Sequence, residues 1–554
     1  MPISPDPSHT PPPSPPPYPS RDSSITAIPP SPTHTYLSTK GAKPTMNHAE
    51  KNLADAPGYV GPTSTDASVV VDPAKDRAAQ GRMTSEDEEL LQFEIDPAEQ
   101  KKLIRKLDML IAPLVMVLYL IAFLDRSNIG NAYTAGLGTD LKNFPVNGLS
   151  TATSLFYVTY VTLETPMATL LKTLRPSRLI PGVTIAWGAT VLGSGFLRTY
   201  GQLLATRLIL GACEAALSPC MFLWLTVWYK RNEIATRQCY LFISAAISGV
   251  VGGLIAAGLL KMDGLHGLRG WQWLYIIEGS ITIAIGILVL FIMPDDYQSA
   301  WILNDREKFL MRVRDIQSRE YMGDMSWSWV EVKKALTEPV VWLSGFSQLG
   351  FDVCLYGFST FLVVIIQQFG FGTIESQLLT APVYFLAAVV YFTGARFSDH
   401  RGVRYWLLMP LGAVSCVGYA ILTGYHGSVG PMLFACFLCG MGIYICVGLH
   451  ITMLSLNMAG YRKRSTAIGI NQTIGNIGGV IAGQIYRTSD KPYYRLGHGV
   501  SLGFFAFGLL CMTLEWRFYV RRNKAKERMT AEDKAMMDEA GVTGDRHYSF
   551  KYEW

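Results

Sequence analysis

The stretch "LIAPLVMVLYLIAFLDRSNIGNA", residues 110–132, decides the fold of this chain. Its first fourteen residues carry no charge, and an acid and a base, Asp125 and Arg126, then follow side by side. A run of this kind is typical of a helix in lipid, where about 20 apolar residues cross roughly 30 Å of hydrocarbon. An ionisable side chain at membrane depth costs at least about 2.5 kcal/mol, so both side chains are expected to face a cavity or a partner.

The apolar pattern recurs along the whole chain. Charged residues make up 16% of the sequence, against about 25% in soluble domains. Two sets of six apolar segments predict an all-α integral membrane protein with twelve transmembrane helices in two bundles. The segments lie near residues 109–124, 149–171, 179–197, 202–228, 239–260 and 272–293, and near 340–366, 376–397, 405–423, 431–457, 465–486 and 499–519.

Composition divides the chain into five parts. Residues 1–106 are rich in Pro, Ser, Thr and Asp, so we predict a disordered cytoplasmic tail. Residues 107–293 and 340–520 form the two bundles, and the dense mixed charge of residues 294–339 predicts a cytoplasmic linker with short amphipathic helices. Residues 521–554 are predicted to be a cytoplasmic C-terminal tail.

Basic residues in the short loops predict the orientation, because Lys and Arg favour the cytoplasmic side. With twelve spans the basic loops fall on one side, so both termini are expected in the cytoplasm. The loop 486–498 on the opposite side also carries basic residues and is an exception. The basic loops are "KTLRPSR" (172–178), "YKRNEIATR" (229–237), "SDHRGVR" (398–404), "YRKR" (461–464) and "RRNKAKER" (521–528).

Several classes of protein are not supported. The chain has no G-x-x-x-x-G-K-[ST] loop for an ATP-driven pump, and no G-x-S-x-G or H-E-x-x-H motif for an enzyme. Its nine cysteines lie in or beside apolar spans, where they are interpreted as packing residues. We therefore expect no cofactor, no metal and no nucleic-acid partner, and a single copy in membrane lipid is sufficient.

The loop "ARFSDHRGVR", residues 395–404, resembles the G-x-x-x-D-R-x-G-R-R signature of the major facilitator superfamily. Asp399, Gly402 and Arg404 match that signature, and Arg401 adds a further base. The resemblance implies a gate formed by these four residues, although a basic topology signal is the simpler alternative. The corresponding loop after the second span has Lys172 near the place of the acid, so that copy departs from the pattern.

Glycine-rich segments lie at matching places in the two halves, 248–258 and 469–483. This internal repeat is typical of secondary transporters. Five further motifs are "FLDRSNIGNAYTAGL", "LRPSR", "TRLILGACEAALSPC", "RGWQWLYIIEGSITIAIGILVLFIMPD" and "YRLGHGVSLG". Together they resemble the anion:cation symporter family, in its fungal allantoate, nicotinate and vitamin permease branch, over roughly residues 105–520.

The resemblance implies roles for the charged residues in the first and fourth spans. Arg126 would clasp a substrate carboxylate, and Asp125 and Glu214 would carry the coupled proton. Arg207 lies seven residues before Glu214, about 10 Å along the same helix face, so the two are not expected to pair directly. Arg207 would hold the network of Glu214 or join the anion site. The alternatives are a structural salt bridge for Asp125 and Arg126, and snorkelling for Arg207.

Other polar residues inside spans are weaker candidates. We predict Tyr356 and Asn471 as further substrate-binding residues, with Asp352 one turn from Tyr356 as its hydrogen-bonding partner. An outer-end cap, or polar contacts between helices, would explain the same residues. Gln472 and Asn476 share the span of Asn471, and Glu164 and His450 are candidates without a partner that the sequence identifies.

The resulting prediction is a proton-coupled transporter that imports a small organic anion by alternating access. The family resemblance implies the plasma membrane, and the vacuolar membrane is an alternative. Efflux of a carboxylated metabolite is an alternative that these motifs allow. A third is a substrate sensor that keeps the fold and does not transport.

Overall fold

The computed structural model describes residues 90–170, 174–322, 329–540, 542 and 544–553. Contacts divide the chain into Met1–Val70, outside the described residues, and Val71–Trp554. Most of the predicted tail, residues 1–89, is likewise outside them. The last ten residues before position 107 are helical, because α4 already begins at Pro97. Asp96 caps this helix by accepting from the Ala98 N–H, and proline is favourable at a first helical position.

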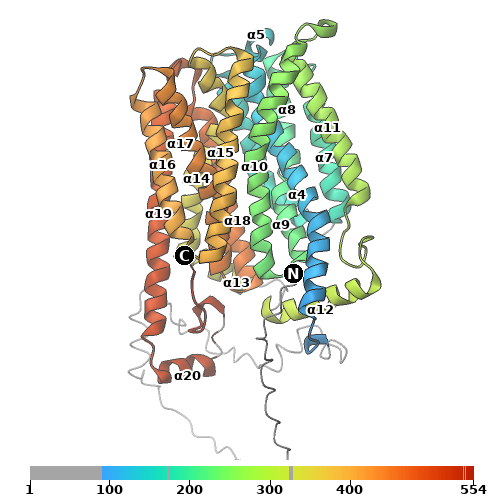
Figure 1. Cartoon of the computed structure of the whole chain (residues 1–554), viewed down its shortest axis with the longest axis vertical. Helices are drawn as coiled ribbons and strands as arrows, with labels where there is room; N and C mark the ends of the chain where they lie inside the picture. Colours follow the sequence, from blue (N-terminus) through green and yellow to red (C-terminus); the bar gives the residue numbers. More distant parts are fainter. Residues whose placement is uncertain (1–89, 171–173, 323–328, 541, 543, 554) are drawn as a thin grey trace, which may run out of the picture. The chain divides into compact units, whose positions relative to one another are not determined.

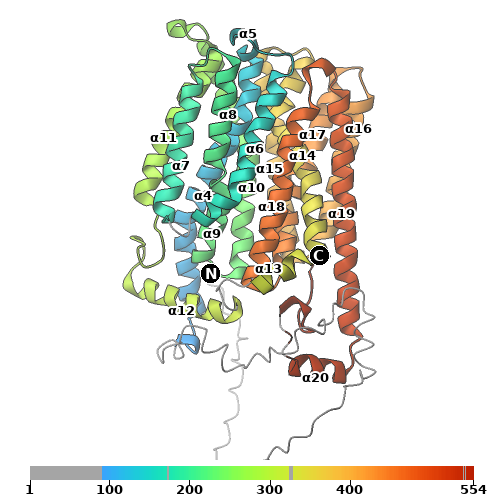
Figure 2. The same cartoon turned by 180° about the vertical axis from the view of Figure 1, so that it is seen from behind.

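The N-terminal half is a bundle of long helices in which successive spans run in opposite directions (Figures 1 and 2). We call the end that carries α12, α13 and α20 the tail end, and the opposite end, near α5, the far end. The helices of this half are α4 (Pro97–Thr134), α5 (Leu137–Asp140), α6 (Gly148–Leu170), α7 (Pro176–Ser194), α8 (Tyr200–Glu214), α9 (Leu217–Trp228), α10 (Arg231–Leu259), η1 (Leu260–Met262), η2 (Leu265–Gly267) and α11 (Gly270–Ile292).

The C-terminal half repeats this arrangement after the linker. The linker contains α12 (Asp305–Met322) and α13 (Trp329–Leu336), two short helices as the charge pattern predicted. Each of the twelve predicted spans coincides with a helix, or in one case with a pair of helices. The remaining helices are α14 (Pro339–Gln368), α15 (Thr373–Arg401), α16 (Arg404–Gly424), α17 (Val429–Asn457), α18 (Tyr461–Ile485), η3 (Thr488–Asp490), α19 (Arg495–Glu527), α20 (Ala531–Glu539) and η4 (Gly544–Arg546).

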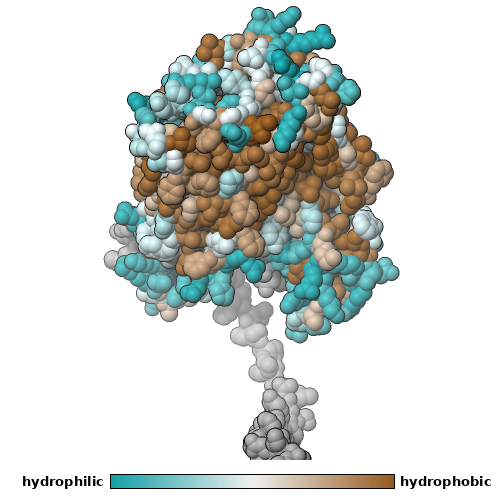
Figure 3. Space-filling model, turned by 45° about the horizontal axis from the view of Figure 1, so that its top comes forward, coloured by the Kyte–Doolittle hydropathy of each residue, from teal (hydrophilic) through white to brown (hydrophobic). Residues whose placement is uncertain are grey.

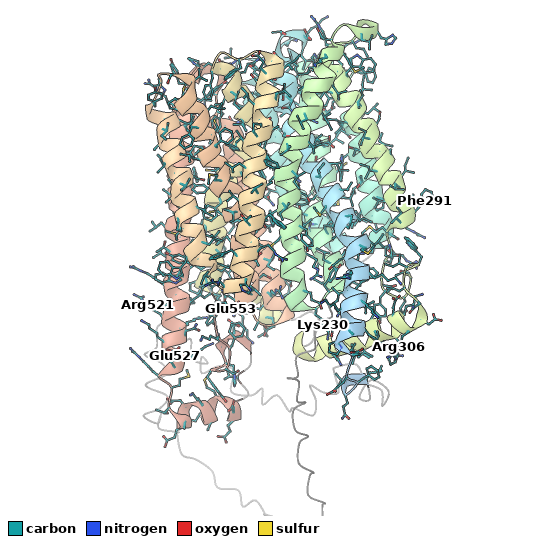
Figure 4. The ribbon with its side chains drawn as sticks, in the orientation of Figure 1. Lys230, Phe291, Arg306, Arg521, Glu527 and Glu553 are labelled. Atoms are coloured by element: carbon teal, nitrogen blue, oxygen red, sulfur yellow. The ribbon has the colours of Figure 1, made fainter. Side chains whose placement is uncertain are left out.

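The surface agrees with a membrane protein. Figure 3 shows a broad hydrophobic band between two hydrophilic ends. Figure 4 places Lys230, Arg306 and Arg521 at the tail end, whereas Phe291, which is 79% exposed, points outward from the side of α11. Among the described residues, nine helices are long and apolar enough to cross a membrane by themselves, with α8 and α9 counted as one. The three others, α6, α7 and α18, are richer in small and polar residues, which favour close helix packing.

The fourth predicted span is broken in the middle. α8 ends at Glu214 and α9 begins at Leu217. Pro219 explains the break, because a proline ring in a helix clashes with the carbonyl four residues earlier, here that of Ala215. The span predicted over residues 202–228 therefore consists of two helices, and the break places Glu214 at a helix end inside the bundle.

The two halves meet through equivalent helices. α10 packs against α15 and α6 packs against α18, so the fifth spanning helix of each half contacts the second of the other. α4 and α14, the first of each half, also pack together. At the far end, Thr134 accepts from Gln377, and Ser150 donates to the Tyr486 carbonyl. This symmetric packing places α4, α6, α14 and α18 around the interface between the halves.

The far-end loop that was an exception to the charge rule also joins the halves. Lys491 lies 3.5 Å from the Tyr133 hydroxyl and 5.3 Å from the centre of its ring. Arg495 donates to His426 in the neighbouring far-end loop. Basic residues on this side therefore have partners on the protein, which accounts for their departure from the loop pattern.

Candidate functional site

Asp125 and Arg126 point in different directions from α4. Both are buried, with 1% and 6% of their surface exposed. Neighbouring residues on a helix are about 100° apart, so the two side chains enter different surroundings. The carboxylate of Asp125 accepts from Trp187 Nε1 at 3.1 Å on α7 and from the Thr282 hydroxyl at 3.3 Å on α11. Asp125 is thus held inside the N-terminal half, and Arg126 alone points toward α8.

Arg126 and Glu214 form a buried ion pair. Arg126 Nε lies 2.6 Å from Glu214 Oε2, and their side chains are 5% and 0% exposed. Arg126 Nη2 and Glu214 Oε1 have no hydrogen-bond partner among the described residues. The pair therefore joins the first and fourth spans directly and leaves donor and acceptor capacity unused.

Aromatic rings surround the Arg126 guanidinium. Its central carbon lies 5.0 Å from the ring centre of Phe123, 5.6 Å from that of Phe156 and 4.6 Å from that of Tyr160. A cation over aromatic faces is stabilised electrostatically, and more so away from water. These rings keep a charged group in an apolar bundle without using up its N–H donors.

Arg207 has a separate partner, as the helix spacing predicted. Its Nη2 donates to the Tyr275 hydroxyl at 2.9 Å, and its central carbon lies 5.9 Å from the Tyr275 ring centre. This contact is with α11, inside the N-terminal half. The role of Arg207 in anion binding stays a prediction.

Tyr356 lies at the contact between the halves. Its ring centre is 4.6 Å from that of Tyr157, and its hydroxyl donates to Asn476 Oδ1 at 2.5 Å. Asn476 in turn donates to Glu164 Oε2 at 3.0 Å, so Glu164 gains the partner that the sequence did not identify. The predicted bond between Tyr356 and Asp352 was wrong, because Asp352 accepts from Gln348 instead.

Asn471 lies away from this interface. Its amide nitrogen donates to the Ser344 hydroxyl at 2.9 Å, and the residue is fully buried. Ser344 also lies 3.5 Å from His450. Asn471 is therefore part of a polar cluster inside the C-terminal half. Asn476, also on α18, is the residue that contacts the N-terminal half.

Two functional candidates were missed in the sequence. Glu278 on α11 is 3% exposed, and neither of its carboxylate oxygens has a hydrogen-bond partner among the described residues. Glu515 on α19 is fully buried beside His450. The signal was present, because both are acids within predicted apolar spans, and such residues mark pathways by default.

The predicted gate is a tight helical turn at the tail end. Gly402 ends α15 with a φ of +66°, a left-handed conformation that glycine adopts without strain. Arg404 is buried and bonds Glu553 at 3.2 Å, and the Arg401 guanidinium lies 5.9 Å from the Phe397 ring centre. The side chain of Asp399, like the whole of Lys172, lies outside the described residues. The four residues remain a predicted gate.

The sequence profile of the Major Facilitator Superfamily matches residues 115–483. The chain belongs to this superfamily. It is 40% identical over 458 residues to an uncharacterized transporter of Schizosaccharomyces pombe, covering 82% of this chain and 91% of the relative. It is 32% identical over 463 residues to a high-affinity nicotinic acid transporter of Saccharomyces cerevisiae, covering 82% of this chain and 85% of that one.

The superfamily fold is also found among solved structures. An inward-facing, unoccupied bacterial homologue of the human lysosomal transporter Spinster superposes with a TM-score of 0.55 at 14% identity, covering 76% of this chain and 98% of that chain. The fungal relatives agree with the predicted permease branch. The chain is therefore a multi-pass membrane transporter for a small molecule, not an enzyme.

Proposed function

We propose that this transporter imports a small organic anion together with protons. The observation that carries the proposal is the buried Arg126–Glu214 pair with its unused donor and acceptor atoms. A guanidinium binds a carboxylate well because its planar N–H groups match the two oxygens. The similarity to a nicotinic acid transporter supports a carboxylate as the anion.

The mechanism follows from competition for one guanidinium. A substrate carboxylate that binds Arg126 displaces Glu214, and a buried carboxylate without its cation favours the protonated form. Substrate and proton therefore bind together. When the proton leaves, Glu214 pairs with Arg126 again and expels the anion. Asp125, held by Trp187 and Thr282, is proposed as a second proton-coupling residue.

Arg207, Tyr356 and Asn471 remain proposed substrate-binding residues. Tyr356 is the best placed of the three, because it contacts both Tyr157 and Asn476 at the interface between the halves. We place the transporter in the plasma membrane, with both termini in the cytoplasm and the tail end on the cytoplasmic side. A single copy is sufficient for rocking of the two halves.

The test is uptake of labelled nicotinate and a panel of other carboxylates, at acidic and neutral external pH, by cells that express the protein. Arg126→Lys is expected to abolish uptake, because an ammonium lacks the planar fork. Glu214→Gln is expected to keep exchange of labelled for unlabelled substrate and to lose accumulation driven by a proton gradient. Arg198→Lys, at an exposed far-end arginine, is the matched control and should transport normally.

Three results contradict the proposal. Uptake that is independent of pH in the parent would show that transport is not coupled to protons. Faster loss of preloaded carboxylate from expressing cells, without uptake, would favour efflux. Absence of transport in both directions, with the protein at the cell surface, would favour a sensor.

A further inference from the structure

A second ionisable pair lies in the C-terminal half, away from Arg126 and Glu214. His450 on α17 and Glu515 on α19 are both fully buried, and His450 Nε2 lies 3.0 Å from Glu515 Oε2. His450 Nδ1 lies 3.1 Å from Gln348 Oε1 on α14. Because an amide oxygen only accepts, Nδ1 carries a hydrogen in this arrangement. Nε2 and the carboxylate must then share one further proton, since otherwise two lone pairs would face each other.

The pair is connected in both directions. Toward the tail end, the Tyr519 hydroxyl donates to Glu515 Oε1 at 2.9 Å. Toward the middle of the bundle, Gln348 Nε2 donates to Asp352 Oδ1 at 3.0 Å. Asp352 and Tyr356 are successive members of a row on one face of α14, four residues apart. We call Glu515, His450, Gln348 and Asp352 the relay.

The relay has two self-consistent arrangements. In the first, a proton is held between His450 and Glu515, and Gln348 donates to Asp352 Oδ1, a contact that an ionised Asp352 can accept. If that proton leaves, the remaining hydrogen of His450 moves to Nε2 to face the carboxylate. Nδ1 then accepts, so the amide of Gln348 must turn, and its oxygen faces Asp352. Asp352 must now be protonated in order to donate.

The two arrangements contain the same number of protons. One proton is bound at Asp352 for each proton released by His450 and Glu515, so net charge is unchanged and no buried anion is added. Titratable groups on the helices around the pair include Asp352 and Tyr356 on α14, Tyr444 and Cys446 on α17, Lys463 and Arg464 on α18, and Cys511 and Tyr519 on α19.

We propose that His450 and Glu515 form a second proton-binding site of the transport cycle. When this site releases its proton, the side-chain amide of Gln348 rotates and Asp352 binds a proton. The proposal rests on the proton coupling proposed above. It gives the C-terminal half its own part in coupling, between the tail end and Tyr356 at the interface between the halves. The alternative is a polar cluster that only holds α14, α17 and α19 together.

Transport of labelled nicotinate by the purified protein in vesicles separates these two roles. Glu515→Gln keeps a hydrogen bond to His450 and cannot release a proton. It is expected to retain nicotinate exchange and to lose accumulation under a proton gradient. Glu532→Gln, at an exposed position on α20, is the control and should accumulate nicotinate like the parent. Unchanged accumulation in Glu515→Gln, or loss of exchange together with accumulation, overturns the proposal.

A second measurement needs no substrate. Infrared difference spectra of the purified protein against pH should contain a protonated-carboxyl band that Asp352→Asn removes. In Glu515→Gln and in His450→Gln this band should persist to higher pH, because the pair no longer opposes protonation of Asp352. A band that titrates as in the parent in both variants overturns the relay. A shifted band in a protein that moves no carboxylate would instead retain the relay and reject the anion import proposed above.

Discussion

At the scale of single residues, the chain keeps several acids buried, with between 0% and 3% of their surface exposed. Asp125 and Glu214 have partners in the bundle, whereas Glu278 has none for either oxygen among the described residues. Burying a polar group without hydrogen bonds costs free energy that an apolar side chain would not cost. Glu278 therefore lowers the stability of the fold relative to an apolar residue, as expected of a residue that is kept for its function.

Replacing Glu278 should raise stability. Glu278→Met fills a similar volume without a polar group, so the free energy of unfolding should rise by roughly 1–3 kcal/mol. The measurement is the melting temperature of the purified protein in detergent. Glu532→Met on α20, at an exposed position, is the control and should leave it unchanged. A lower melting temperature for Glu278→Met would show that the carboxylate has a stabilising partner.

At the scale of helices, glycines set how closely the halves approach. A Cβ at Gly130 on α4 would lie 2.1 Å from the Thr360 carbonyl oxygen on α14, and no rotamer change relieves a clash with backbone. In α10, a Cβ at Gly258 would meet nothing within 4 Å. Glycine is therefore required by the close helix contact at position 130, whereas position 258 has room for a side chain.

Adding one methyl group at each position tests this difference. Gly130→Ala should lower stability by about 1–3 kcal/mol and impair transport, because α4 and α14 must separate. Gly258→Ala should raise stability by roughly 0.5–1 kcal/mol, since alanine favours a helix. Melting temperature and nicotinate exchange measure both effects. Normal exchange in Gly130→Ala would mean that the α4–α14 contact is dispensable.

At the scale of the whole molecule, the C-terminal segment packs on the tail end of its own half. Tyr552 is 2% exposed, stacks on Tyr519 at 5.2 Å and bonds Asn523. Asp545 pairs with Lys463, which also bonds Glu338 at the start of α14. The segment therefore joins α14, α18 and α19 where the predicted gate residue Arg404 meets Glu553.

Removing the Tyr552 ring should release this segment. Tyr552→Ala deletes a buried aromatic side chain, a change that costs roughly 3 kcal/mol in well-packed sites. Hydrogen exchange of residues 544–553 is expected to become much faster, whereas the exposed neighbour change Lys551→Ala should have no effect. Unchanged exchange in Tyr552→Ala would show that the charged contacts alone hold the segment.

The spans, the membrane class and the superfamily could be predicted from the sequence, because hydropathy is a property of each segment by itself. The presence of Asp125, Arg126 and Glu214 inside apolar spans also identified the candidate site. The break after Glu214 was missed, although Pro219 signalled it. Glu278 and Glu515 were missed in the same way, as acids visible in the sequence.

Only the tertiary structure decided which of these groups meet. Arg126 pairs with Glu214 across 88 positions and His450 with Glu515 across 65. Complementary charges on the first and fourth spans were expected to be partners if these spans adjoin, whereas no pattern in the sequence links His450 with Glu515. The rotation of each helix about its axis decides whether a side chain faces a partner, and that rotation depends on packing against other helices. The sequence therefore determined which residues carry charge into the membrane, and packing determined that Asp125 and Arg126, though adjacent, serve different neighbours.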